Sequence, residues 1–365
     1  MVKIAVDGRP LQGQLSGVGK YVLQVLIALA KQVPDCHITI FTNKPLEITF
    51  SLVNVNIRYD TVFEKIKPLI WSKFLLGRLL KKEHFDFYFF GGTFTPVQKL
   101  KGKKITVVHD LNHIYAKETM SKLHYLTHVL FYKKDIAGAD FIIANSHGTA
   151  SKLKSNCNIT AHHVLHPPIN EHYKIIDKTA VAEVLGSLGI NYKYILTVAT
   201  QEPRKNLDKT IHAFLFLKKQ QALSGQKLLL VGGEGWKNTA LHTLINSDED
   251  IIRMGYVAEK HLPYIYNGAS SFVFPSKYEG YGMPATEALL CGIKPIVSDI
   301  EELREATSGH AYYIDPENLN QYTDCILTAI SNQPAENTAF DADLRMAFDN
   351  EFKALLTLLK ITPAC

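Results

Sequence analysis

The chain has few cysteines, and their arrangement does not suit a covalent framework. Five occur among 365 residues, which is an odd number. No two have the spacing of a disulfide framework or of a metal site, so we expect a protein of a reducing compartment. The five are Cys36, Cys157, Cys291, Cys325 and Cys365.

Long apolar runs and a strong charge of either sign are also missing. No run is long enough to span a bilayer. The segment from Met1 to Asp7 reads directly as a strand, without the cationic region and apolar core of a signal peptide. We therefore expect a cytoplasmic protein. A net charge of +5 argues against a dedicated nucleic-acid partner but allows a positive cleft for phosphates.

The sequence does contain a regular alternation of strand and helix patterns. Apolar residues make up 46% of the chain and charged residues 21%, and the length is typical of two globular domains. Short apolar runs alternate with longer helical patterns, which indicates parallel sheets covered by helices on both faces. Pro167 and Pro168 interrupt this pattern, so we place a domain hinge there. The predicted fold is α/β, with two doubly wound Rossmann-like domains at residues 1–168 and 169–344.

The individual elements follow from the same patterns. The expected strands are residues 3–6, 37–41, 55–59, 85–90, 104–109 and 141–144, then 194–199, 227–231, 251–254, 271–274 and 295–298. The clearest expected helices are residues 18–32, 67–83, 121–137, 206–223, 239–247, 258–267, 284–291 and 318–331, with a last apolar stripe at 341–360.

The most informative stretch runs from residue 278 to residue 288. Glu279 and Glu287 stand eight positions apart, after a run that reads as a buried strand. Pro284 suits the first turn of a helix, so we expect Glu279 on a loop and Glu287 in that first turn. The N–H groups of Gly282 and Met283 would then lie at a helix N-terminus, where they bind an anion. A carboxylate on each side of an anion site suits a nucleotide-sugar.

A pair of adjacent cations follows the strand expected at 194–199. Arg204 can fork two phosphate oxygens, while Lys205 acts as a point charge. Cations at the start of a helix oppose its dipole, so they favour an anion nearby.

These two motifs carry a family resemblance. Residues 278–288, with Glu, seven residues and Glu enclosing Gly-Met-Pro, resemble the donor-site motif of retaining glycosyltransferases of family 4. That family has the GT-B fold, in which two Rossmann-like domains face each other across a cleft. The resemblance implies that the final helix, at about 345–365, packs back on the first domain. It also implies that the protein needs no cofactor and no metal, because a matching Arg-Lys pair neutralises the departing diphosphate.

The resemblance assigns further roles. Glu287 would hold the ribose hydroxyls, Glu279 would bond the 3-hydroxyl of the donor sugar, and the N–H groups of Gly282 and Met283, before Pro284, would reach neighbouring oxygens. Gly17, in a glycine loop at 16–21, would lie against the donor diphosphate and the acceptor. The remaining matches are His109 for positioning the donor sugar, Asp110 for orienting a backbone or the acceptor, and Ser146 for lining the cleft.

Glycines at two neighbouring strand ends predict a slot for the nucleotide base. Gly232 and the backbone of Tyr256 and Val257 would contact the base, with Leu262 and Tyr266 on the wall, in the region where the family binds it. Tight strand-to-helix turns are an equally good interpretation of each glycine taken singly.

The segment from Lys65 to Lys82 is basic, apolar and carries Trp71. Such a helix could lie on an anionic membrane surface, where a lipid-linked acceptor would sit. We favour an ordinary domain helix that packs Trp71, Leu75 and Leu79 inward and leaves its lysines in solvent, because a following strand needs a covering helix.

Within the family, residues 7–9, 17–21 and 108–110 look most like bacterial mannosyltransferases of surface polysaccharide and lipopolysaccharide synthesis. The expected function is hexose transfer from GDP-mannose to a saccharide, free or lipid-linked, with contact to the inner face of the membrane. A UDP-hexose donor and a GT-B-fold nucleotide-sugar epimerase are the alternatives. A nicotinamide dehydrogenase is disfavoured, because the loop at 16–21 lacks the third glycine of the dinucleotide fingerprint.

Overall fold

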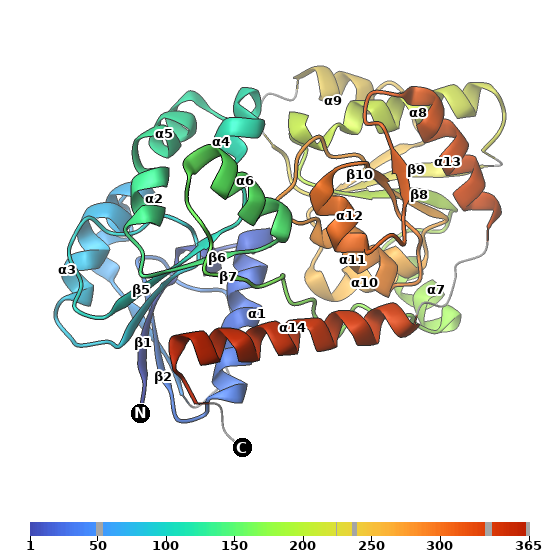
Figure 1. Ribbon diagram of the computed structural model, residues 1–365. Helices are drawn as coiled ribbons and strands as arrows, with labels where there is room; N and C mark the ends of the chain where they lie inside the picture. The colour runs from blue at the N-terminus through green and yellow to red at the C-terminus, as the bar shows by residue number, and fades with distance from the viewer. Residues whose placement is uncertain (49–53, 224, 236–238, 333–337, 363–365) are drawn as a thin grey trace. The chain divides into compact units, whose positions relative to one another are not determined.

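The computed structural model describes all residues except 49–53, 224, 236–238, 333–337 and 363–365. Its internal contacts divide the chain into two units, each a parallel sheet with helices (Figure 1). Unit 1 comprises Met1–Ile114, Met120–Pro168 and Arg345–Cys365, and unit 2 comprises Tyr115–Thr119 and Ile169–Leu344. The main division falls directly after Pro168, the second of the two prolines in the expected hinge.

In unit 1 the described strands form a parallel sheet in the order β3-β2-β1-β4-β5-β6-β7. The order reverses beside β1, and ligands of doubly wound sheets bind at such a reversal, beyond the carboxyl ends of the strands. The strands are β1 (Lys3–Asp7), β2 (His37–Thr42), β3 (Val55–Tyr59), β4 (Phe87–Phe90), β5 (Lys103–Val108), β6 (Phe141–Ala144) and β7 (His163–Val164). The helices are α1 (Gly17–Gln32), α2 (Pro68–Ile70), α3 (Leu76–Leu80), α4 (Asn112–Tyr115), α5 (Lys122–Ala137), α6 (His147–Cys157) and, from Arg345 onward, α14 (Thr338–Leu359).

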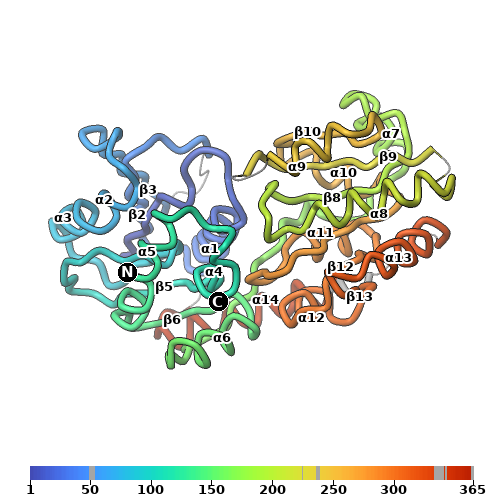
Figure 2. Tube along the Cα trace, turned by 90° about the horizontal axis from the view of Figure 1, so that it is seen from above, coloured from blue at the N-terminus to red at the C-terminus, as the bar shows by residue number. Residues whose placement is uncertain are grey.

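In unit 2 the described strands have the order β10-β9-β8-β11-β12-β13, and the reversal lies between β8 and β11. Figure 2 labels β10, β9 and β8 on one side of this unit and β12 and β13 on the other. Residues that follow β8 and β11 therefore meet at one edge of the sheet, although about 75 positions separate them in sequence. The strands are β8 (Tyr194–Val198), β9 (Lys227–Val231), β10 (Ile251–Gly255), β11 (Ser271–Phe274), β12 (Ile296–Ser298) and β13 (Tyr312–Ile314). The helices are α7 (Lys178–Ser187), α8 (Leu207–Lys219), α9 (Thr239–Ile245), α10 (Leu262–Asn267), α11 (Met283–Leu290), α12 (Glu301–Thr307) and α13 (Leu319–Ser331).

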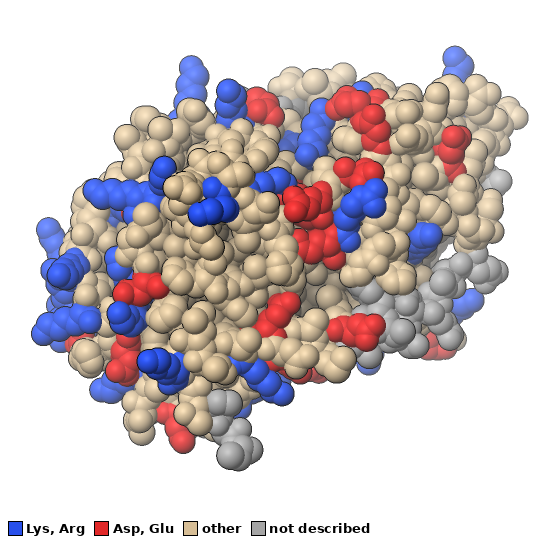
Figure 3. All heavy atoms as spheres, in the orientation of Figure 1, with Lys and Arg blue, Asp and Glu red and all other residues tan. Residues whose placement is uncertain are grey.

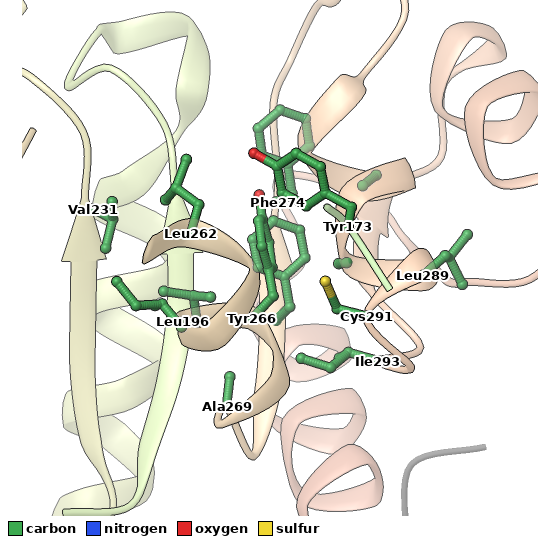
Figure 4. Close-up of a cluster of buried hydrophobic side chains, with 14 of the residues drawn as sticks. Tyr173, Leu196, Val231, Leu262, Tyr266, Ala269, Phe274, Leu289, Cys291 and Ile293 are labelled. Carbon is green, nitrogen blue, oxygen red and sulfur yellow. The ribbon is translucent and has the colours of Figure 1, made fainter. Parts of the chain in front are cut away.

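Apolar side chains cover both faces of the sheet in unit 2. Figure 4 shows one of these clusters, in which Leu196 and Val231 of the sheet lie beside Leu262 of α10. Tyr266 and Phe274 belong to the same cluster and are fully buried. This packing holds α10 and α11 against β8 and β11, and so fixes the base of the loops that follow these strands.

The segment that carries Trp71 departs from the expected helix. Trp71 is fully buried, but the turn Trp71–Leu75 is a π-helix between α2 and α3. A π-turn holds more residues than an α-turn, so it rotates the following side chains around the axis. Leu76 and Leu80 are buried, whereas the predicted Leu75 and Leu79 are only partly buried.

The expected solvent position of the lysines in this segment is wrong for Lys73. Its Nζ lies 2.6 Å from both carboxylate oxygens of Asp135 on α5 and donates to the carbonyl of Thr95 at 2.8 Å. Trp71, Ser72 and Lys73 are all buried, so this turn is covered on more than one side, and the ion pair makes burial of the charge of Lys73 tolerable.

No helix among the described residues is both long and apolar enough to cross a membrane.

Candidate functional site

The predicted cations follow β8 on a short turn. Pro203–Lys205 form a 3-10 turn, and Asn206 then takes a left-handed backbone, with φ of 56°, before α8 begins at Leu207. The N–H of Lys277, in the loop after β11, donates to the carbonyl of Arg204 at 2.8 Å. This backbone bond ties the loop that carries the cations to the loop that carries Glu279.

Arg204, Lys205 and Glu279 converge in one ion cluster. Lys205 Nζ donates to Glu279 Oε1, and Arg204 Nη1 lies 3.4 Å from Glu279 Oε2. Arg204 Nε also donates to Glu202 Oε2 at 2.9 Å. Glu202 was missed in the sequence, because an acidic residue before a proline gives no signal of its own. The cluster joins two cations to two carboxylates at the edge of the sheet where the strand order reverses.

Burial and charge oppose each other within this cluster. Burial alone would raise the pKa of Glu279, but the charges of Lys205 and Arg204 outweigh it and hold that pKa below its usual value. Burial, with Arg204 adjacent, lowers the pKa of Lys205. Lys205 Nζ also lies 4.9 Å from the centre of the Phe274 ring, and this cation–π contact stabilises the ammonium group.

The start of α11 has the geometry expected of an anion site. Gly282 has φ of +117°, and a Cβ there would lie 2.4 Å from Leu303 Cδ2, so this position requires glycine. Pro284 is the second residue of the helix. Among the described residues, no acceptor is found for the N–H of Gly282 or of Met283. Both donors are therefore available to a ligand.

Glu287 lies deeper than expected. It is the fifth residue of α11, so it stands in the second turn and not in the first. Its side chain is buried, and Oε2 accepts a hydrogen bond of 2.9 Å from the hydroxyl of Tyr266. Burial raises the pKa of Tyr266, so its hydroxyl stays protonated and remains a donor. Tyr266 thus orients Glu287 from within the core.

The glycines expected at the base slot have different roles. Gly232 has φ of +137°, a Cβ there would lie 2.1 Å from the carbonyl oxygen of Ala199, and its N–H donates to Gly255 at the end of β10. The tight-turn interpretation therefore accounts for Gly232. A Cβ on Gly255 would meet nothing within 4 Å. Beside these turns, Tyr256 is 50% exposed, while Val257 and Leu262 are buried.

In unit 1, three predicted residues follow two neighbouring strands. His109 follows β5, and its Nε2 lies 2.7 Å from the carbonyl oxygen of Gly91. Burial lowers the pKa of His109, so the ring is neutral and Nε2–H donates in this bond. One carboxylate oxygen of Asp110 accepts from the backbone N–H of Asn112 and the other from its side-chain amide. These bonds favour the role of Asp110 in orienting the neighbouring backbone. Ser146 follows β6 and caps α6 through the N–H of Thr149.

Gly17 and Gly19 differ in what surrounds them. Gly17 is exposed at the start of α1, and a Cβ there would meet nothing within 4 Å. A Cβ on Gly19 would lie 2.3 Å from the carbonyl oxygen of Pro10. The open space at Gly17 suits the approach of a ligand, whereas Gly19 is required by packing.

This difference gives a matched pair of variants. We expect Gly17→Ala to leave the melting temperature unchanged but to lower the rate of the expected sugar transfer, because the methyl group occupies the space in front of the helix. We expect Gly19→Ala to destabilise the protein by ~1–3 kcal/mol through overpacking. Thermal unfolding and initial rates measure the two effects. Full activity of Gly17→Ala would show that Gly17 does not contact the ligand.

Comparisons with known proteins place the chain in a family. The family model described as "Glycosyltransferase Family 4" matches residues 15–173, and the model described as "Glycosyl transferases group 1" matches residues 186–345. The O-antigen chain mannosyltransferase B of Escherichia coli is 24% identical over 351 residues, covering 91% of each chain. The O-antigen chain mannosyltransferase RfbU of Salmonella typhimurium is 23% identical and covers 72% of this chain and 71% of its own.

Solved structures share the fold. A sucrose-phosphate synthase from Thermosynechococcus elongatus has a TM-score of 0.71 at 17% identity, covering 98% of this chain and 96% of its own. HepE of Anabaena, solved with UDP and glucose, has a TM-score of 0.70 at 15% identity and covers 99% of each chain. The predicted fold, two parallel-sheet Rossmann-like domains of the GT-B class, is confirmed.

Proposed function

Because the chain belongs to the GT-B glycosyltransferases of family 4 and is therefore nucleotide-sugar-dependent, we propose that it transfers mannose from GDP-mannose to a growing surface polysaccharide. The names of its relatives support this sugar, since two of them are O-antigen mannosyltransferases. The acceptor in this proposal is a saccharide carried on a lipid at the inner face of the cell membrane. Transfer retains the configuration at the anomeric carbon.

The observation that carries the proposal is the cluster of Arg204, Lys205 and Glu279 beside the start of α11. The cluster is close to neutral without ligand, because two carboxylates balance the two cations. A diphosphate would accept from both cations where they stand and from the N–H groups of Gly282 and Met283. Glu279 keeps further lone pairs with which it would accept from a hydroxyl of the donor sugar.

In the proposed reaction the cations act on the leaving group. The acceptor oxygen bonds to the anomeric carbon while the bond from that carbon to the diphosphate oxygen breaks. The acceptor proton passes to a phosphate oxygen on the same face. Negative charge grows on the diphosphate, and Lys205 and Arg204 stabilise that charge from fixed positions. The role of His109 at the donor sugar stays a prediction.

Nucleotide binding tests the proposal directly. We expect GDP to raise the melting temperature more than UDP, ADP or dTDP at equal concentration, since a ligand of the folded state stabilises it by RT ln(1 + [L]/Kd). A larger shift with UDP would favour the UDP-hexose alternative. An epimerase would convert the donor to a new sugar-nucleotide without any acceptor, which chromatography of a donor-only incubation would detect.

A second experiment concerns metals. We propose that the two cations replace a divalent ion, so EDTA should leave the initial rate within about twofold of its untreated value, well short of the loss that one missing electrostatic contact produces. Loss of activity that magnesium restores would contradict this part of the proposal.

A further inference from the structure

Helix α5 buries a mixed face and exposes an apolar one. Thr127, Tyr132, Asp135 and Ile136 are buried, and Asp135 is bound by Lys73. Surface helices ordinarily bury their apolar stripe, whereas four large aliphatic residues of α5 are exposed. The exposed side chains, here called the α5 stripe, are Leu123 (65% exposed), Leu126 (52%), Val129 (55%) and Leu130 (58%).

The α5 stripe is continuous along the helix. Leu123, Leu126 and Leu130 are three and four positions apart, so they lie on one face, and Val129 borders them. Lys122 precedes the stripe, and Lys133 and Lys134 follow it, all three exposed. The helix therefore presents four large apolar groups between cations.

The charge of the chain is divided unequally between the two units. Unit 1 contains 24 Lys and Arg residues against 12 Asp and Glu residues, a net charge of +12. Unit 2 contains 16 against 23, a net charge of −7, and the two values give the +5 of the whole chain. Lys and Arg side chains are scattered over the face of unit 1 that Figure 3 shows. The apolar stripe thus belongs to the basic unit.

We propose that the α5 stripe inserts into the surface of a bilayer that contains anionic lipids. Apolar side chains flanked by lysines bind such a surface by burying the former among acyl chains and placing the latter among the headgroups. The contact proposed here lies on α5 and not on the segment that carries Trp71, which is buried as an ordinary domain helix requires. The inference rests on the proposed function in one respect only. A lipid-carried acceptor would lie at the membrane surface, and this explains why the protein would bind there.

A tryptophan placed on the stripe tests the contact. Leu126→Trp should shift its emission to shorter wavelength and should be quenched by brominated acyl chains when vesicles of phosphatidylglycerol and phosphatidylcholine are added. The matched control is Phe216→Trp on α8 of unit 2, where the native side chain is 48% exposed. Its emission should not change. Spectra of the unsubstituted chain are subtracted from both. Equal quenching of the two probes, or quenching of neither, would overturn the proposal.

Cosedimentation measures the strength of binding. We expect the unsubstituted protein to partition onto anionic vesicles, more weakly onto pure phosphatidylcholine, and less at high salt. Leu126→Gln with Leu130→Gln should lower the partition coefficient at least tenfold, while Phe216→Gln should not lower it. A concentration-dependent dimer in light scattering that the double variant abolishes would show instead that a second copy covers the stripe.

The same double variant separates this inference from the proposed function. With a water-soluble saccharide acceptor its rate should equal that of the unsubstituted protein, because neither Leu126 nor Leu130 is a residue of the candidate site. If the unsubstituted protein binds vesicles but has no transferase activity, the α5 contact stands and the proposed function is contradicted. If it is active but does not bind vesicles, the proposed function stands and the α5 contact is contradicted.

Discussion

Lys205→Ala should lower the turnover number by 10²–10³, because preorganised charge at a departing group is typically worth that much. Lys205 is buried and its ammonium is fixed by Glu279 and by the Phe274 ring, so it needs no reorganisation during the reaction. Arg204→Ala should cost at least about tenfold, since Arg204 divides its bonds between Glu202 and Glu279. Steady-state rates at saturating donor measure both losses.

Two controls separate chemistry from folding. Lys209→Ala removes a nearby cation on α8, whose side chain is 29% exposed and pairs with Glu317 at the surface, so the turnover of this variant should be unchanged. Removing Lys205 leaves Glu279 buried without its closer cation, at 3.4 Å from Arg204 Nη1. Lys205→Met with Glu279→Gln should therefore recover the melting temperature but not the activity. A turnover number close to the native value in Lys205→Ala would contradict the proposed mechanism.

Lys73→Met should destabilise unit 1 by ~3–5 kcal/mol, which is the usual cost of leaving one buried charge without its partner. The side chains of Lys73 and Asp135 are 1% and 6% exposed. Burial lowers the pKa of Lys73 and raises the pKa of Asp135, so each group is costly to keep charged alone. The midpoint of denaturant unfolding measures the loss.

A second substitution should restore most of that stability. Lys73→Met with Asp135→Asn removes both charges and keeps an acceptor for the N–H of Thr95, which donates to Asp135 at 3.1 Å. Replacing both members of a buried pair is often nearly neutral. A double variant as unstable as the single one would show that packing around Lys73, and not its charge, supports this region.

The sequence predicts the sheets well because their strands are short apolar runs between polar residues. The expected bounds 55–59, 141–144, 227–231 and 271–274 agree with the structure at both ends. The strands β7 and β13 were missed, since two or three residues are too short to show a period. Helix α6 was missed because it buries few apolar residues, although Ser146 is a recognisable N-cap.

The sequence named the residues of the candidate site, and the sheet topology shows how three of them meet. Strong local motifs identify Arg204, Lys205 and Glu279, and the adjacency of β8 and β11 brings them together. Glu287 was expected in the first turn of α11 and lies in the second, because the helix begins at Met283, one residue before its expected start. Lys73 was misplaced for a different reason. Three consecutive residues, Trp71 to Lys73, are buried, so the buried part of this turn is wider than the single face that a helical period predicts.

Helix α14 has a consequence for biosynthesis. Its side chains Phe352, Leu355, Leu356 and Leu359 pack in the core formed by β1, α1 and their neighbours, so unit 1 is built from residues synthesised before unit 2 and residues synthesised after it. Domains commonly fold while the ribosome is still translating, but the core of unit 1 is incomplete until α14 has emerged. Unit 2, a continuous segment apart from one short loop, can finish first. A nascent chain should therefore need protection of the apolar surface that α14 later covers, and ribosomes stalled before Arg345 would carry a finished second unit and an unfinished first one.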